Sequence, residues 1–216
     1  RYVGKPVTYS VKQYCYNMLG TYNEVDYPSY GKLRTLLVDL LNYGAAAQQY
    51  VSYKTDTLVN ANLLDKQKAW GTQTDRTPES IQNSAYETVE NPTVTWEGAK
   101  LVLTDSIVVR YTLAAEDLEG LSVKVRLTDK EYVIDGSELV PTDIDGQYYF
   151  DFDKLNAGQM SEKILTTVYV NGEAVSNTAS YSVESYVARL SSSDETLVTL
   201  VKAMLRYGDA AAAYVN

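Results

Sequence analysis

The feature of this sequence that most constrains its fold is an internal repeat. Residues 33–51 (LRTLLVDLLNYGAAAQQYV) and 197–215 (LVTLVKAMLRYGDAAAAYV) are identical at ten of nineteen aligned positions. A shorter match, Tyr-Ser-Val-x-x-Tyr, precedes each copy, at 9–14 and at 181–186. The offset between the copies changes from 172 to 164, so the first copy carries an eight-residue insertion around 20–30. Each copy predicts a helical hairpin, and the shared pattern predicts that the two hairpins pack together as a helical cluster.

Helical periodicity supports this interpretation of the first copy. Its apolar residues recur at a spacing of 3.6 and predict one buried face, made of Leu33, Leu36, Leu37, Leu40, Leu41, Gly44, Ala47 and Val51. A glycine followed by alanines in each copy favours close approach of a neighbouring helix. We therefore expect Tyr43, Gly44, Tyr207 and Gly208 at the contact between the hairpins. The serines of the shorter match, Ser10 and Ser182, suit helix N-caps.

Between the copies the periodicity changes from 3.6 to 2, which is typical of β-strands. Alternating segments run over 100–104, 107–113, 121–127, 131–134, 147–152 and 163–170. Asp135-Gly136, Asp145-Gly146 and Asn171-Gly172 are turn signals. The pattern predicts an antiparallel, immunoglobulin-like β-sandwich.

The expected organisation is an α+β chain in four parts. Residues 1–56 form the first helical hairpin and 57–87 a polar linker with a short helix near 64–70. Residues 88–178 form the sandwich, and 179–216 form the second hairpin, packed on the first. Because the chain opens on Arg1 without a signal-like stretch, we expect it to be a processed or excised piece of a longer protein.

Composition excludes several classes of function. Histidine is absent, which removes Ser-His-Asp and Cys-His catalytic sites and His-ligated zinc. The single cysteine, Cys15, lies in an apolar helical pattern and is expected to be buried and inert. A net charge of −9 disfavours binding to nucleic acid or to anionic lipid, and no apolar run is long enough to insert into a membrane. We expect no cofactor and no metal.

Two acidic motifs have competing interpretations. The run Asp143-Ile-Asp145-Gly146 resembles the start of a calcium loop but lacks the glutamate that completes one, so we interpret it as a hairpin turn. Asp151 and Asp153 are expected to share one strand face, which would suit the two carboxylates of a glycosidase. Solvated strand positions explain them equally well, and we expect no enzymatic activity.

Tyrosine is in excess, with 20 residues beside only 2 phenylalanines and 2 tryptophans. Tyrosine offers a flat apolar face and a polar edge, as wet contact surfaces require. Trp70 lies in a polar stretch that has no apolar periodicity, and Trp96 lies at the start of the first sandwich strand. The two tryptophans either cover the seam between sandwich and helices or stack on sugar rings.

Several motifs together resemble a known type of module. They are the two Tyr-Ser-Val-x-x-Tyr segments, the Leu-x-x-Tyr-Gly-x-Ala-Ala-x-x-Tyr segment, Thr57-Leu-Val-Asn-Ala-Asn-Leu, Glu97-Gly-Ala-Lys-Leu-Val-Leu and Gln159-Met-Ser. This set is similar to a module of large extracellular proteins from gut anaerobes. The expected fold also resembles domains of the starch adherence proteins of the amylosome, which bind α-1,4-glucan through aromatic residues. The resemblance implies a non-catalytic starch-binding module of a multimodular protein, outside the cell or on its surface.

The expected ligand site follows from these hypotheses. The stacking platforms would be Trp70 and Trp96, followed by Tyr22, Tyr27, Tyr30 and Tyr53. The hydrogen-bonding side chains would be Lys68, Gln73, Asp75 and Arg76, which flank Trp70 in sequence. The alternative is a structural spacer or protein-interaction module with no glycan ligand, whose tryptophans would be buried at the seam.

Overall fold

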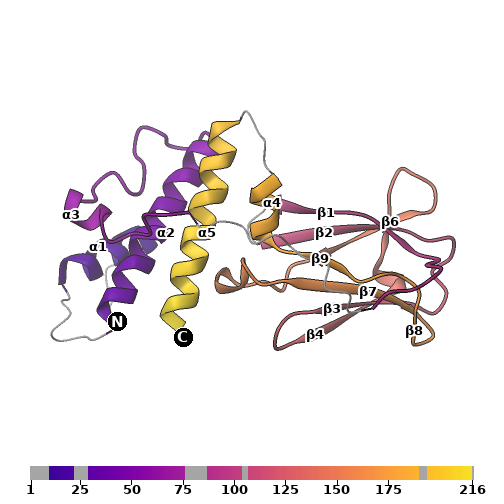
Figure 1. Ribbon diagram of the computed structural model, residues 1–216. Helices are drawn as coiled ribbons and strands as arrows, with labels where there is room; N and C mark the ends of the chain where they lie inside the picture. Colours follow the sequence, from indigo (N-terminus) through magenta and orange to yellow (C-terminus); the bar gives the residue numbers. More distant parts are fainter. Residues whose placement is uncertain (1–9, 22–28, 76–86, 104–106, 190–193, 216) are drawn as a thin grey trace, which may run out of the picture. The chain divides into compact units, whose positions relative to one another are not determined.

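The computed structural model describes residues 10–21, 29–75, 87–103, 107–189 and 194–215 (Figure 1). The chain divides into two compact units. The helical unit comprises 1–76 together with 191–216, and the sandwich unit comprises 77–190. No helix in the described ranges is both long enough and apolar enough to cross a bilayer.

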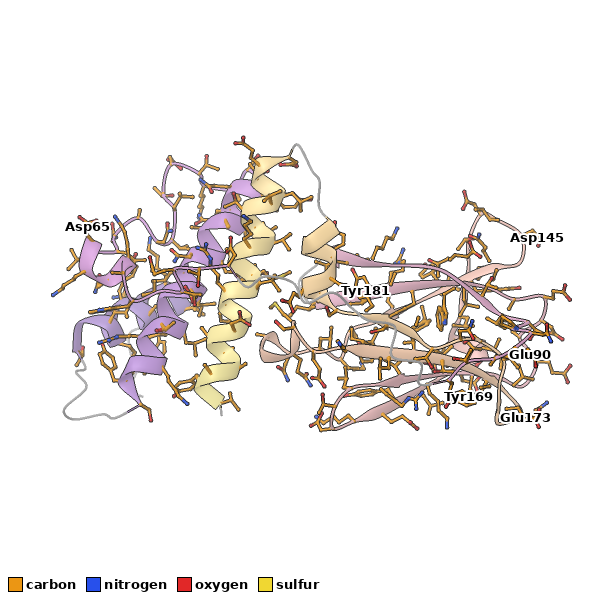
Figure 2. The ribbon with its side chains drawn as sticks, viewed as in Figure 1. Asp65, Glu90, Asp145, Tyr169, Glu173 and Tyr181 are labelled. Carbon is orange, nitrogen blue, oxygen red and sulfur yellow. The ribbon has the colours of Figure 1, made fainter. Side chains whose placement is uncertain are left out.

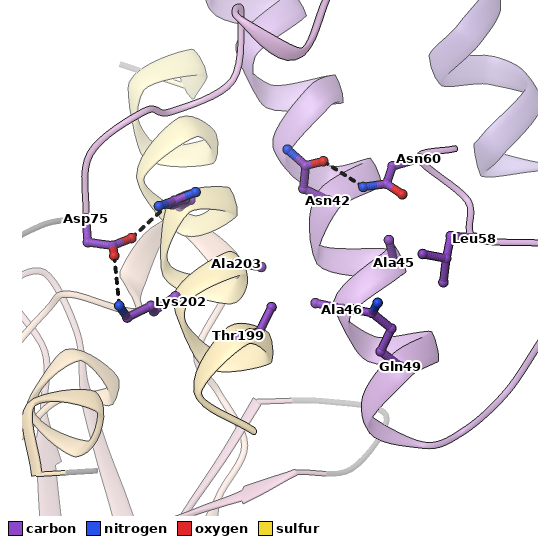
Figure 3. A pocket seen from close by; sticks show the side chains of 11 residues that line it. Asn42, Ala45, Ala46, Gln49, Leu58, Asn60, Asp75, Thr199, Lys202 and Ala203 are labelled. Carbon is purple, nitrogen blue, oxygen red and sulfur yellow. Dashed lines mark hydrogen bonds and ion pairs between the residues drawn. The ribbon is translucent and has the colours of Figure 1, made fainter. Parts of the chain in front are cut away.

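The helical unit joins the two copies of the long repeat. It contains α1 (Val11–Thr21), α2 (Tyr30–Tyr50), α3 (Asp65–Lys68) and α5 (Glu195–Val215). The two long helices, α2 and α5, pack against each other and run antiparallel (Figures 1 and 3). The rings of Tyr43 and Tyr207, which are equivalent in the repeat, stack with their centroids 5.8 Å apart and their planes 3° apart. The predicted contact between the copies is confirmed at these two tyrosines.

A small apolar core holds α1 and the segment before α3 against α2. Its buried members are Cys15, Leu19, Leu37, Val38, Leu41 and Leu63. Cys15 is fully buried, and burial raises the pKa of its thiol, so the expectation of an inert cysteine agrees with the structure. Ser10 caps α1 as predicted, because its hydroxyl accepts a hydrogen bond from the Gln13 N–H at 3.1 Å.

The second predicted hairpin is not confirmed as a packing unit. Helix α4 (Val183–Arg189) belongs to the sandwich unit, where it contacts β1 (Thr95–Leu103). It directly follows β9 (Ala179–Tyr181), and the Glu184 N–H donates to the Met160 carbonyl at 3.2 Å. Strand pairing therefore holds the shorter repeat in the sandwich unit, whereas α5 packs on α2 in the helical unit.

Two further expectations about α2 are wrong. Val51 is 64% exposed, because it lies at the C-cap, past the part of α2 that faces the core. Gly44 does not provide the close approach to α5. A Cβ built on Gly44 would meet Cγ2 of Val59, in the segment after α2, at 2.9 Å.

The sandwich unit contains two antiparallel sheets among its described residues, which confirms the α+β class and agrees with a β-sandwich. The four-stranded sheet has the order β1-β2-β6-β5, and the five-stranded sheet has the order β4-β3-β7-β8 with β9 paired to β7. The remaining strands are β2 (Ile107–Ala114), β3 (Leu121–Arg126), β4 (Glu131–Asp135), β5 (Val140–Pro141), β6 (Gln147–Phe152), β7 (Ile164–Val170) and β8 (Glu173–Ala174). The immunoglobulin-like arrangement stays a prediction.

Alternation along the strands separates the core of the sandwich from its outer faces. On β2 the side chains of Val109, Tyr111 and Leu113 are fully buried, and those between them are only partly buried. Asn171 and Gly172, both with positive φ, form the turn from β7 to β8 as predicted. The run 143–146 lies in the turn between β5 and β6.

We predict that Gly44→Leu lowers the free energy of unfolding by about 1–3 kcal/mol, because the added side chain overpacks the contact with Val59. The matched control is Gly20→Leu in α1, where a Cβ would meet no atom within 4 Å. Both changes replace a helical glycine, so the difference between them isolates the packing effect. Urea unfolding monitored by circular dichroism measures it, and equal stabilities of the two variants would contradict the prediction.

Candidate functional site

The helical unit contains a polar pocket between α2 and α5, which we call the α2–α5 pocket (Figure 3). Its volume is about 410 Å³. It is lined by Asn42, Ala45, Ala46, Gln49, Leu58, Asn60, Asp75, Thr199, Lys202, Ala203 and Arg206. Four separate stretches of the chain therefore converge on one cavity.

Helical periodicity explains how the two helices supply its walls. The lining residues of α2 are 42, 45, 46 and 49, and those of α5 are 199, 202, 203 and 206. Both sets follow the i, i+3, i+4, i+7 spacing of a single helix face. Because the helices are antiparallel, Gln49 lies at the same end of the pocket as Thr199 (Figure 3). Alanines at the middle positions leave the space open between the polar side chains.

Amide side chains form one side of the pocket. The Asn60 Nδ2 donates to Asn42 Oδ1 at 3.0 Å, which fixes the orientation of both amides. The neighbouring Gln48 holds the segment that carries Asn60, since its Oε1 accepts from the Val59 N–H at 2.7 Å. The Asn42 amide nitrogen and the Asn60 amide oxygen make no further hydrogen bond within the described residues.

Charged side chains form the opposite side. Asp75 pairs with Arg206 at 2.8 Å and with Lys202 at 3.2 Å. Burial acts to raise the pKa of Asp75, but the hydrogen bonds from Lys202 and Arg206 outweigh burial and lower that pKa. Asp75 therefore stays ionised near neutral pH, and its charge offsets one of the two cations.

A buried carboxylate fastens the segment before Asp75 to α2. Asp39 is 1% exposed, and it accepts hydrogen bonds from the Thr72 N–H at 3.1 Å and from the Thr72 hydroxyl at 2.7 Å. Nearer the start of α2, the Thr35 hydroxyl donates a hydrogen bond to the Trp70 carbonyl at 2.8 Å. These contacts hold the stretch from Trp70 to Thr72 along α2 and so place Asp75 at the pocket.

The structure gives Trp70 a packing role. Its ring is half-buried against the helical core, and the Arg34 guanidinium lies 5.1 Å from the ring centroid. The residues predicted to bind a ligand beside Trp70 have different surroundings in the structure. Asp75 lines the pocket, whereas Lys68 pairs with Asp65 at 2.9 Å. Asp65 lies on α3 (Figure 2). The side chain of Gln73 donates to the backbone carbonyl of Gly71.

Trp96 belongs to the sandwich unit. Its indole N–H donates to the Asn177 carbonyl at 2.9 Å. Its ring packs in a T-shaped arrangement with that of buried Tyr111, with centroids 5.9 Å apart. Trp96 therefore contacts both the four-stranded sheet and the segment between β8 and β9, whereas Trp70 belongs to the helical unit.

The tyrosines predicted as stacking platforms differ in their exposure to solvent. Tyr30 is 3% exposed and its hydroxyl donates to the Met18 carbonyl at 3.2 Å, so burial removes it as a stacking platform. Tyr53 is 56% exposed. Tyr22, Tyr27 and Arg76 lie outside the described residues.

The loop that carries Tyr53 connects two residues that line the α2–α5 pocket, Gln49 and Leu58. Ser52 and Lys54, on either side of Tyr53, both have positive φ, which is uncommon for residues with a side chain. The Tyr53 N–H donates to the Gln48 carbonyl at 2.8 Å. The Lys54 ammonium lies 5.0 Å from the Tyr53 ring centroid. The loop between these two lining residues thus carries an aromatic ring that is exposed to solvent.

No protein-family model matches this chain, and comparisons with curated proteins and with solved structures also find no match. The function therefore has to be argued from the geometry of the chain itself.

Sequence reasoning missed most of the pocket. Asn42, Gln49 and Lys202 lie on helices that the repeat predicts, at positions where the two copies differ. The available signal was a polar residue in one copy that aligns with a different residue in the other copy. That signal does not show which positions face each other across an antiparallel pair.

The two carboxylates that were considered for catalysis, Asp151 and Asp153, are each engaged by a cation. Asp151 accepts two hydrogen bonds of 2.7 Å from Arg110, and Asp153 pairs with Lys154 at 2.7 Å. Within the described ranges, no three His, Cys, Asp or Glu side chains gather into a group that could hold a metal ion.

The buried Asp39 gives a testable dependence of stability on pH. Burial raises its pKa, although the hydrogen bonds from Thr72 and the charge of Arg206 act in the opposite direction. The folded state therefore binds a proton more tightly than the unfolded state, whose pKa is about 3.9. We predict that the Asp39 contribution to stability is complete below about pH 4 and is lost as the pH rises through the raised pKa.

The test is urea unfolding from pH 3 to pH 8. Asp39→Asn should flatten the fall in unfolding free energy above about pH 4 relative to the wild type. Asp56→Asn, which changes an exposed aspartate of the same unit, should leave the profile parallel to that of the wild type. Parallel profiles for Asp39→Asn and wild type would show that Asp39 does not cause the effect.

Proposed function

We propose that this chain is a non-catalytic carbohydrate-binding module whose ligand occupies the α2–α5 pocket. The observation that carries the proposal is a polar cavity of about 410 Å³, two of whose lining residues, Gln49 and Leu58, are joined by a loop that carries the exposed Tyr53. The resemblance of the sequence motifs makes α-1,4-glucan, the chain of starch, the first ligand to test. It also suggests that the module acts outside the cell or on its surface, within a larger protein.

The lining of the pocket suits the hydroxyl groups of a sugar. Each hydroxyl is both a donor and an acceptor, and the side-chain amides of Asn42, Gln49 and Asn60 also offer both. Asp75 adds acceptors, while Lys202 and Arg206 add donors. Fixed polar groups around small apolar residues are typical of sites that orient a small ligand.

Tyr53 supplies the apolar component that sugar recognition requires. A sugar ring has a face of C–H groups, and an aromatic ring offers a flat apolar surface of matching size. Because the Tyr53 loop starts and ends at residues that line the pocket, a glucan chain held in the pocket would extend toward this ring. Tyr53 thus takes the role that the sequence suggested for the tryptophans.

The electrostatics of the pocket favour binding over catalysis. Hydrolysis of a glycosidic bond needs a carboxyl group that donates a proton near neutral pH. Asp75 has a lowered pKa and is held by two cations. Such a carboxylate orients a ligand but does not protonate a leaving group.

The test is isothermal titration with maltoheptaose, together with affinity gels containing starch, cellulose, xylan or mannan. We expect dissociation constants between micromolar and millimolar, about −8 to −4 kcal/mol, which change little with salt because the ligand is uncharged. Gln49→Ala and Tyr53→Ala should each weaken binding by about 1 kcal/mol, roughly fivefold.

Tyr214→Ala is the matched control, because Tyr214 is an exposed tyrosine at the C-terminal end of α5, away from the Thr199 end of the pocket. It should bind like the parent. If Gln49→Ala and Tyr53→Ala both fold and bind unchanged, the pocket is not the site. If the parent binds none of the four polysaccharides, the carbohydrate function is wrong.

The half-buried tryptophans favour a second candidate, a structural spacer or protein-interaction module. A spacer needs stable packing and no ligand, and Trp70 and Trp96 both serve packing. Retention on none of the polysaccharide gels would support this alternative. Retention that depends on Tyr53 would exclude it.

A further inference from the structure

The outer face of the four-stranded sheet contains a second polar cavity, which we call the outer-sheet hollow. Its volume is about 390 Å³, and it is lined by Glu97, Gly98, Ala99, Lys100, Arg110, Thr112 and Gln147. The strand register explains the grouping, because Gly98 pairs with Thr112 and Lys100 with Arg110. On β2 the alternate residues Tyr111 and Leu113 are buried in the core, so Arg110 and Thr112 face outward.

A β-bulge opens the hollow. The register between β1 and β2 shifts between Trp96 and Gly98, so Glu97 is the extra residue. Trp96 turns inward to contact Tyr111, and Gly98 comes opposite outward-facing Thr112. A Cβ on Gly98 would meet no atom within 4 Å. The missing side chain therefore leaves free space on the sheet that no neighbour fills.

One wall of the hollow is rigidly held. Arg110 donates two hydrogen bonds of 2.7 Å to Asp151, and its guanidinium lies 4.0 Å from the ring centroid of Tyr149. Asp151 and Tyr149 come from β6, next to β2 in the sheet. The two bonds use Nε and Nη2 of Arg110, so the Nη1 donors stay available in a fixed position. Preorganised donors bind a ligand at a smaller cost in side-chain entropy.

The charges around the hollow indicate the class of ligand. Lys100 and Arg110 are balanced by Glu97 and Asp151, so the group has no net charge. Thr112 and Gln147 add groups that both donate and accept hydrogen bonds. This mixture matches hydroxyl groups and gives no advantage to an anionic ligand.

We propose that the outer-sheet hollow is a second binding site, which takes a neutral oligosaccharide. The site belongs to the sandwich unit and shares no residue with the α2–α5 pocket, so it does not rest on the function proposed for that pocket. It would give one chain two separate glycan sites.

The test is titration of the ¹⁵N-labelled full chain with maltoheptaose, cellohexaose, xylohexaose and mannohexaose, followed by amide chemical shifts. At least one of these should produce saturable shifts at 97–100, 110–112 and 147. Shifts at 42–49 and 199–206 report separately on the α2–α5 pocket, so the failure of one site is distinguished from the failure of the other.

Gly98→Gln tests the hollow directly, because a Cβ at this position meets no atom within 4 Å and the longer side chain can occupy the open space. It should weaken binding at the sheet about tenfold or more, while the shifts of the helical unit stay unchanged. Gly20→Gln, in α1, is the matched control and should bind like the parent. Three results would each overturn the proposal. The first is that none of the four sugars shifts the sheet residues, and the second is that Gly98→Gln binds as tightly as the parent. The third is that the sheet residues respond only to trigalacturonate, an anionic sugar.

Discussion

The antiparallel contact between α2 and α5 is the interaction on which the helical unit depends. It joins two stretches 164 residues apart, and the parallel rings of Tyr43 and Tyr207 lie at its centre. Closing so long a loop costs conformational entropy, which buried apolar area and aromatic stacking must offset. The α2–α5 pocket exists only because of this contact, since each helix supplies one wall.

Much of the fold could be predicted from the sequence because its signals are local. The repeat indicated α2, α5 and the meeting of Tyr43 with Tyr207, and alternating residues indicated most of the longer strands. The partner of Gly44 and the position of α4 depend on long-range packing, which periodicity does not encode. Gly44 meets Val59, and α4 stays with the strand that precedes it.

The candidate site was less predictable, for a physical reason. Trp70 and Trp96 looked available because their sequence neighbours are polar, yet tertiary contacts with Arg34 and with Asn177 occupy them. The lining of the pocket comes from four separate stretches, so no short motif marks it. Of the predicted residues that the structure describes, Asp75 lines the pocket and Tyr53 lies in a loop between two lining residues. Both belong to irregular segments, whose paths periodicity does not predict.

The division of the chain also determines which part of the molecule would carry a mechanical load. The stretches before and after the sandwich both belong to the helical unit, so the sandwich is an insertion within it. Tension applied between residues 10 and 215 would therefore be resisted first by the contact of α2 with α5. The sheets would bear no tension for as long as those two helices hold together. A ligand bound to the sheets would therefore be shielded from the applied force.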